Sequence, residues 1–199
     1  MTRIIAGTAR SRRIKVPSEG TRPTSDRARE GLFSSLQARV GFQDQVVLDL
    51  FAGSGALGLE ALSRGARSVT LVDSSPQAVA TIKHNIQVVA KELPKDSARV
   101  VEAKASTFVA GAQQGYFTMV LADPPYDLGD DAVHEMLCAL QPLLADGAMV
   151  VVERHRDSAQ TQWPDGFEPT SQKLKKRTFG IARFDMALWR RVAHAEMNE

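Results

Sequence analysis

The stretch that decides the fold is Val46-Val47-Leu48-Asp49-Leu50-Phe51-Ala52-Gly53-Ser54-Gly55-Ala56-Leu57-Gly58-Leu59-Glu60-Ala61-Leu62. A β-rich apolar run enters a Gly-x-Gly turn and continues as a helix, which ends near Arg64 and Gly65. Gly53 and Gly55 permit positive φ and the close approach of a ligand to the backbone. The free N–H groups of the helix N-terminus follow them. This stretch predicts the strand–turn–helix unit of an open α/β sheet that binds a nucleoside-like ligand.

The glycine spacing also matches the dinucleotide fingerprint, which is weak on its own. Asp49 argues against a nicotinamide cofactor, because it lies inside the strand end, where it can reach the amino group of a ligand. Asp73 ends the next predicted strand, 68–72, beside the glycine turn, and is placed to accept hydrogen bonds from both hydroxyls of a ribose. Phe51 and Ser74 complete the candidate cofactor site.

A second informative stretch is Asp123-Pro124-Pro125-Tyr126, which follows the apolar run 118–122. The two prolines stop the strand and fix φ, and they restrain the residue before them. The result is a stiff loop at the carboxyl edge of the sheet, where ligands bind in α/β folds. Its acceptors suit an exocyclic amine and its ring can stack on a base. An ordinary proline turn would have the same sequence in isolation.

Composition narrows the class of protein. The chain has 199 residues and 43% apolar residues, which suits one domain with a small appendage. Cys138 is the only cysteine, so a disulfide framework and a thiolate zinc site are excluded, and its apolar neighbours predict a buried small side chain. The four histidines lie far apart, and we expect no metal site. No membrane-spanning run or signal peptide is visible, which favours the cytoplasm.

The charge is unevenly distributed. The net charge is +2, but residues 1–40 contain nine basic and three acidic residues, which leaves −4 for the remainder. Residues 3–7 and 12–17 are predicted to form a hairpin around the loop 8–11. The asymmetry favours a nucleic-acid partner at this end, although a solvated basic face is the alternative. The candidate RNA-contacting residues are Arg3, Arg10, Arg12, Arg13, Arg22, Thr24 and Arg27.

The remaining elements follow from periodicity. Ser25 or Thr24 caps a helix over 26–38, whose first turns leave Arg27 and Arg29 available for a phosphate or a cofactor carboxylate. Glu153 and His155 could form an acid–base pair, but nothing in the sequence fixes their geometry. Further segments are a helix at 76–91, strands at 99–103 and 148–153, a helix at 131–144, an irregular stretch at 164–169, and a hairpin of 173–179 and 181–189 whose basic residues extend the positive surface.

Together these features resemble the class I S-adenosylmethionine-dependent methyltransferases, and the Asp-Pro-Pro-aromatic loop resembles that of their amino-methylating branch. Within it the chain is similar to the bacterial 16S ribosomal RNA guanine-N2 methyltransferase family, of RsmD type. The similarity is carried by residues 3–7, 22–30, 50–61 and 123–126. It implies a Rossmann-like fold with a mainly parallel seven-stranded sheet and one antiparallel strand from a C-terminal hairpin. A hairpin appendage at 1–20, a methyltransferase domain at 21–191 and a frayed tail at 192–199 are expected.

The resemblance also implies roles. Asp49, Phe51, Gly53, Gly55, Asp73 and Ser74 would hold S-adenosylmethionine, and Ser106 would replace the adenine-contacting acid that relatives carry after the third strand. Asp123, Pro124, Pro125 and Tyr126 would form the catalytic loop. The substrate would be one guanine of 16S rRNA in the small subunit or an assembly intermediate, and a monomer without membrane association is expected.

Three alternatives remain open at this point. The proline loop alone does not separate guanine N2 from adenine N6, so a DNA adenine methyltransferase is the nearest, although 199 residues leave little space for a target-recognition segment. A non-catalytic RNA-binding assembly protein could keep the fold. A nicotinamide dehydrogenase is the third.

Overall fold

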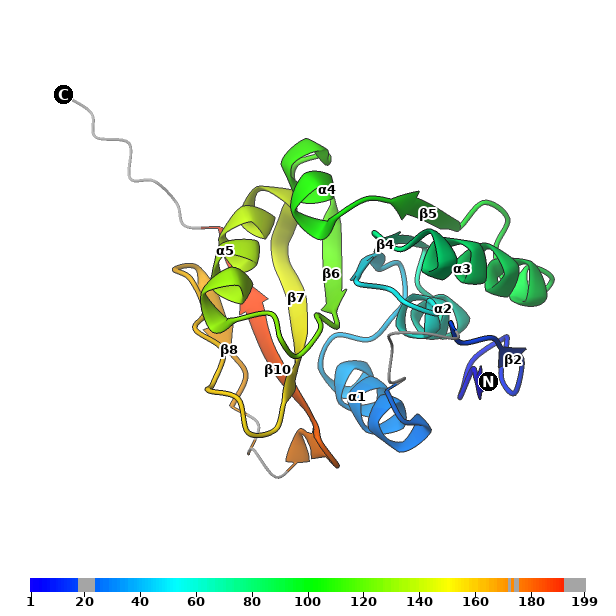
Figure 1. Ribbon diagram of the computed structural model, residues 1–199, viewed down its shortest axis with the longest axis horizontal. Helices are drawn as coiled ribbons and strands as arrows, with labels where there is room; N and C mark the ends of the chain where they lie inside the picture. Colours follow the sequence, from blue (N-terminus) through cyan, green and yellow to red (C-terminus); the bar gives the residue numbers. More distant parts are fainter. Residues whose placement is uncertain (18–23, 172, 174–175, 192–199) are drawn as a thin grey trace.

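The computed structural model describes residues 1–17, 24–171, 173 and 176–191. It has a central sheet covered by helices on both faces, with the N-terminus beside α2 and α3 (Figure 1). Within the described ranges, none of the helices has the length and apolar character needed to cross a bilayer.

The sheet has the order β5-β4-β3-β6-β7-β10-β8, and a short β9 pairs with β10. Strands β3 to β7 are parallel, whereas β10 runs antiparallel to β7 and β8. This confirms the predicted mainly parallel sheet and its antiparallel strand. The stretch 164–169 is not wholly irregular as predicted, because its last residues form β8. The strands are β3 Val46–Leu50, β4 Ser68–Asp73, β5 Ala98–Glu102, β6 Phe117–Ala122, β7 Leu144–His155, β8 Phe167–Pro169, β9 Thr178–Phe179 and β10 Ala182–Trp189.

Two apolar cores separate the helices into layers. Helices α1 (Asp26–Arg39), α2 (Ala56–Ser63) and α3 (Pro76–Val89) pack on one face of the sheet, and α4 (Ala105–Gly111) and α5 (Asp130–Leu140) with the 3-10 turn Gln141–Leu143 pack on the other. Alternate residues of β3 enter the two cores, as Val47 and Leu48 illustrate. Helix α4 was not predicted.

Local sequence signals fix the helix starts near the site. Ser25 caps α1 by accepting a hydrogen bond from the Ala28 N–H (3.2 Å), as predicted. Gly55 begins α2 with φ +76°, and a Cβ at this position would lie 2.9 Å from Cδ2 of Leu71. Gly55 therefore serves the turn and the close packing of α2 on β4.

The N-terminal hairpin is shorter than predicted, with strands β1 (Thr2–Arg3) and β2 (Arg13–Ile14), but it rests on the main body as expected. Ile4 and Ile14 are buried in the core of the α1–α3 face. The buried side chain of Glu60 accepts hydrogen bonds from the N–H groups of Ile5 (2.7 Å) and Ala6 (3.0 Å).

Asn85, for which no role is predicted from the sequence, attaches the other strand of the hairpin. Its side chain bonds both the N–H and the C=O of Lys15, and it also donates to the Ser54 carbonyl in the glycine turn, each at 2.8 Å. The hairpin is therefore linked directly to the turn that the sequence identified as the cofactor site.

Two predictions of burial were wrong. Cys138 is exposed on α5 rather than a buried apolar side chain. Conversely, Arg183 does not extend a positive surface: it is 2% exposed and donates to Asp185 and to the carbonyls of Ser158 and Ala159. Arg177 also pairs with Asp185, at 2.7 Å.

Candidate active site

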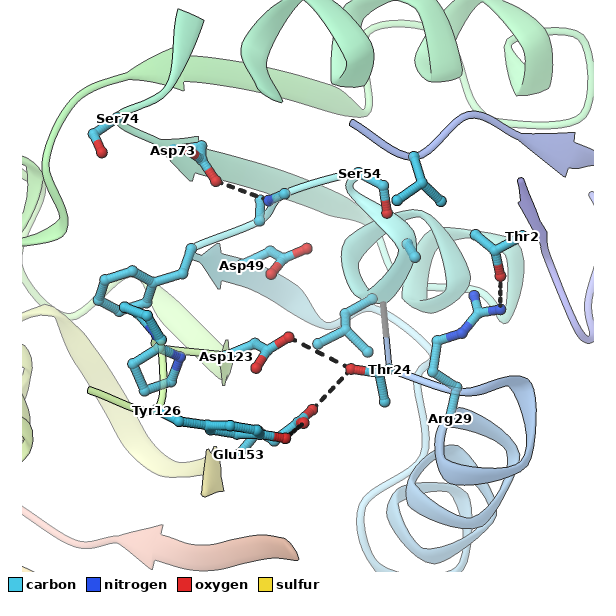
Figure 2. Close-up of a pocket in the computed structure, with 18 residues that line it drawn as sticks. Thr2, Thr24, Arg29, Asp49, Ser54, Asp73, Ser74, Asp123, Tyr126 and Glu153 are labelled. Atoms are coloured by element: carbon cyan, nitrogen blue, oxygen red, sulfur yellow. Dashed lines mark hydrogen bonds between the residues drawn. The ribbon is translucent and has the colours of Figure 1, made fainter. Parts of the chain in front are cut away.

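A cleft of about 430 Å³ lies at the carboxyl edge of the sheet, where the ends of β3, β4 and β6 meet. This is the position at which open α/β sheets bind ligands. Figure 2 shows Asp73 and Ser74 at one side of the cleft, Thr2 and Arg29 at the other, and Asp49 and Asp123 between them. The lining residues include the predicted Asp49, Phe51, Gly53, Asp73, Ser74, Asp123, Pro124, Pro125 and Tyr126, together with Thr2, Val16, Thr24, Arg29, Ala52, Ser54, Ala56, Leu57 and Glu153.

Asp49 is a buried carboxyl group whose two oxygens differ. Oδ2 accepts a hydrogen bond from the Gly58 N–H at 2.8 Å, whereas Oδ1 has no partner among the residues that the structure describes. Burial raises the pKa of Asp49 to about 7, the Gly58 hydrogen bond opposes the rise, and the charge of Asp73 adds to it. An unsatisfied acceptor on the cleft wall suits a ligand that brings a donor or a positive charge.

Asp73 fixes the glycine turn. Its carboxylate accepts hydrogen bonds from the N–H groups of Gly53 (2.8 Å) and Ser75 (2.9 Å). Gly53 itself has φ +55°, and Phe51 before it has φ +59°. The structure thus brings the predicted nucleoside-binding residues of β3 and β4 together, with Ser74 exposed beside them.

Two predicted cofactor residues lie elsewhere. Gly55 faces Leu71 and is absent from the cleft wall that the described residues form. Ser106 is also outside that wall, because α4 begins at Ala105 and carries Ser106 on an exposed side. Neither residue lines the cleft, and their roles as ligand contacts stay predictions.

The proline loop meets Glu153, for which the sequence suggested a pair with His155 without fixing its geometry. The Tyr126 hydroxyl donates to Oε1 of Glu153 at 2.9 Å, and the Thr24 hydroxyl donates to Oε2 at 2.8 Å. Thr24 also lies 3.4 Å from Oδ2 of Asp123 (Figure 2). Glu153 is 4% exposed, so these two hydroxyls hold its side chain in one place at the end of β7. Thr24 is therefore a residue of the site itself, and not simply a surface contact.

The three acids influence one another. Burial raises the pKa of Asp123 well above its ordinary value, and the charges of Glu153 and Asp49 add to the rise. Burial also raises the pKa of Glu153, against the hydrogen bonds from Thr24 and Tyr126. Neighbouring buried carboxyl groups hold protons more tightly than exposed ones and favour cationic ligands.

A wider hollow of about 910 Å³ adjoins the cleft between α1 and the β9–β10 segment. Tyr126 and Glu153 line both cavities. The Tyr126 ring is 42% exposed and packs edge-on against His155, with ring centroids 5.2 Å apart. A planar group could reach the ring from this hollow, and Arg27 lies on its wall.

The predicted RNA-contacting arginines occupy a different region. Arg3, Arg10, Arg12 and Arg13 are exposed on the N-terminal hairpin and do not line the cleft. Arg3 pairs with Asp26 and Arg12 pairs with Glu92. Arg22 lies outside the described residues.

The cleft fits S-adenosylmethionine in its chemistry. Asp73 and Ser74 offer acceptors for a nucleoside at one side, the unpartnered oxygen of Asp49 faces the middle, and a buried arginine stands at the far side. A zwitterionic ligand with a central positive charge matches this order.

The fold and the site together are those of a class I methyltransferase, whose sheet is Rossmann-like. A family model described as "Conserved hypothetical protein 95" matches residues 2–186. The chain belongs to this family, and the fold makes S-adenosylmethionine its expected cofactor.

Relatives of known name support the same assignment. The chain is 35% identical to the ribosomal RNA small subunit methyltransferase D of Haemophilus influenzae, over 92% of this chain and 91% of that protein. It is 41% identical to the protein of the same name from Escherichia coli K12, over 86% and 84% of the two chains. The solved structure of Escherichia coli yhhF superimposes with a TM-score of 0.78 at 34% identity and covers 95% of this chain and 98% of that chain.

Proposed function

We propose that the protein transfers a methyl group from S-adenosylmethionine to the exocyclic N2 amine of one guanine in 16S ribosomal RNA. The substrate would be the small subunit or an assembly intermediate, which would place the protein in the cytoplasm, and the enzyme would act as a monomer. The names of the Haemophilus influenzae and Escherichia coli relatives support ribosomal RNA as the substrate class. The observation that carries the choice of guanine is the pair formed by Asp123 and Glu153.

The two carboxyl groups match the donor pattern of guanine. The Watson–Crick edge of guanine presents N1–H and the N2 amine as adjacent donors, whereas adenine presents one amine beside the N1 acceptor. An ionised carboxylate only accepts hydrogen bonds. When both carboxyl groups are ionised, Asp123 beside Glu153 suits guanine, and the N1 acceptor of adenine would face an acceptor instead. A base turned out of its stack is commonly recognised along this edge.

The roles of the residues follow from the geometry. S-adenosylmethionine, when bound, supplies an electrophilic methyl group on a positively charged sulfur. Tyr126 stacks on the base, and the carboxylate of Asp123 with the Pro124 carbonyl accepts the N2 hydrogens and directs the nitrogen lone pair into the cleft. Transfer would form the N2–CH3 bond as the bond between the methyl group and sulfur breaks, would leave neutral S-adenosylhomocysteine, and would release one proton from N2 to Asp123 or Glu153. Asp123 and Glu153 are better proton acceptors than exposed carboxylates, because burial raises their pKa values.

The wider hollow is the route by which the RNA strand would reach Tyr126. It shares Tyr126 and Glu153 with the cofactor cleft, and Arg27 on its wall can contact a phosphate of a nucleotide next to the target. The exposed Arg10 and Arg13 of the hairpin would contact the RNA backbone farther from the target base.

The test is methyl transfer with identification of the product. Small subunits that lack the modification are incubated with radiolabelled S-adenosylmethionine and digested to nucleosides, and we expect label in N2-methylguanosine. Asp123→Ala should abolish transfer while S-adenosylhomocysteine still binds. Asp127→Ala, an exposed change in the same loop, should leave transfer unchanged.

Each alternative has its own outcome in this assay. Label in N6-methyladenine of duplex DNA, with none in small subunits, would identify an adenine methyltransferase and overturn the proposal. Binding to RNA without transfer to any RNA substrate would identify an assembly protein that keeps the fold. If Asp123→Ala lost cofactor binding and methyl transfer in parallel, Asp123 would be assigned to cofactor binding instead of base recognition.

A further inference from the structure

Arg29 is a fully buried arginine that the sequence placed on an accessible helix start. Its guanidinium uses only one nitrogen: Nη2 lies 2.7 Å from the Thr2 hydroxyl oxygen, 2.8 Å from the Arg3 carbonyl and 2.7 Å from Oδ1 of Asp26. Nε and Nη1 have no hydrogen-bond partner within the described part of the chain. The side chain is 0% exposed and lines the cleft.

Such an arrangement is costly without a further partner. A buried charge with unpaired N–H groups loses its hydration and receives nothing in return, so buried guanidinium groups are normally fully hydrogen-bonded. Among the described residues, the carboxylate that contacts Arg29 is that of Asp26, which is 45% exposed and reaches only Nη2. Nε and Nη1 lie on different sides of the guanidinium, and each keeps an N–H group available for an anion such as a carboxylate.

The position of Arg29 in the cleft identifies the anion. Arg29 and Thr2 lie across the cleft from Asp73 and Ser74, with Asp49 between (Figure 2). If the adenosine occupies the Asp73 side, the amino-acid end of the cofactor extends toward Arg29. The first turn of α2, which contributes Ala56 and Leu57 to the cleft, adds positive potential to the same cavity.

We propose that Arg29 binds the α-carboxylate of the methionyl group of S-adenosylmethionine through an unpartnered N–H group of its guanidinium. This residue lies in α1, outside the strand–turn–helix unit that carries Asp49 and Gly53. Because Nη2 of the same guanidinium holds Thr2 and Arg3, the cofactor carboxylate and the first strand of the hairpin share one side chain. The inference concerns the cofactor alone and does not depend on which base is methylated.

The experiment compares two ligands that differ by one carboxylate. Calorimetry measures the affinity of S-adenosylhomocysteine and of its decarboxylated analogue, which keeps the amine, for the full chain. For the wild type we expect the carboxylate to strengthen binding by about 10- to 150-fold, the range for hydrogen bonds to charged groups. In Arg29→Met this difference should nearly vanish, because the affinity for S-adenosylhomocysteine falls while that for the analogue is kept. Retained binding of the analogue also demonstrates that the variant is folded.

Two further variants sharpen the comparison. Arg39→Met, an exposed change on the same helix, should leave both affinities as they are. Arg29→Lys, which keeps the charge but not the planar set of donors, should retain only part of the carboxylate effect. The assignment would be overturned by equal losses for both ligands in Arg29→Met, which would indicate a structural role. The assignment would also be overturned if Arg29→Met kept its affinity for S-adenosylhomocysteine but bound RNA more weakly. Arg29 would then contact a phosphate of the RNA.

Discussion

Replacing Asp49 by Asn should make the protein more stable at neutral and alkaline pH while weakening cofactor binding. The change keeps the shape of the side chain, and its amide oxygen can still accept the hydrogen bond from Gly58. It removes a negative charge that is almost fully buried and has one unpartnered oxygen. The same charge is what the cleft offers to a ligand that brings a donor or a cation.

The sign and size of the stability change follow from the pKa of Asp49. The folded state raises it from 3.8 to about 7, so the folded protein binds a proton more tightly than the unfolded chain does. The stability that this proton confers is fully present below about pH 4 and is lost as the pH rises to about 7. At about 1.4 kcal/mol per pKa unit, the loss reaches about 4 kcal/mol, which is an upper limit for what Asp49→Asn restores.

Urea unfolding at pH 4 and at pH 8 measures the effect. The two proteins should have similar free energies of unfolding at pH 4, and Asp49→Asn should be at least about 1 kcal/mol more stable at pH 8. Asp165→Asn, an exposed carboxylate before β8, controls for the loss of a carboxylate as such. A stability difference that is the same at both pH values, or a variant less stable at pH 8, would refute the assigned burial cost.

Two further predictions concern the turn and the hairpin. Gly55→Ala should lower the free energy of unfolding by about 1–2 kcal/mol in urea, because φ is +76° and the new Cβ would meet Leu71, whereas Gly129→Ala, with φ −61° and open space, should be neutral. If Gly55→Ala has the same free energy of unfolding as the wild type, the left-handed conformation assigned to Gly55 is contradicted. Changing Arg10 and Arg13 to Ala should weaken RNA binding and reduce the slope of log affinity against log salt by about 1–2. A slope equal to that of the wild type would remove the hairpin from the RNA interface.

The sequence predicted well those parts of the fold that depend on neighbouring residues. An apolar run, a left-handed glycine and an apolar helical stripe are local signals, and the stretch from Val46 to Leu62 contains all three. Asp73 and the double-proline loop were placed correctly for the same reason, since Asp73 is the last residue of β4 and the loop directly follows β6. The parallel order of β3, β4 and β6 then brings their carboxyl ends together.

Residues that depend on distant partners could not be placed this way. Glu153 meets Thr24 across 129 positions, and their contact requires β7 beside β6 and the start of α1 above the sheet edge. Arg29 lies three and four positions before Leu32 and Phe33, on the buried side of α1, but its charge made it read as an accessible residue. Its contacts with Thr2 and Arg3, like the contact between Glu153 and Thr24, leave no mark in the local pattern.

One missed feature did carry a signal. Arg183 and Asp185 are two positions apart on a strand and therefore lie on the same face, where opposite charges can pair. Their alternation with apolar residues suggested a solvated basic face instead. The segment 156–161 covers this face, because its carbonyls accept hydrogen bonds from Arg183.

The way in which Glu60 and Asn85 hold the hairpin makes the amino-terminal residues impossible to exchange as a separate part. Deleting them would leave the buried carboxyl group of Glu60 and the amide of Asn85 without the main-chain groups of the hairpin that they now bond. A graft of this hairpin onto another protein of the same fold would have to carry the matching acid and amide on the recipient's helices. The hairpin therefore has to be transferred together with Glu60 and Asn85. A swap that omits these two residues should yield a protein that does not fold.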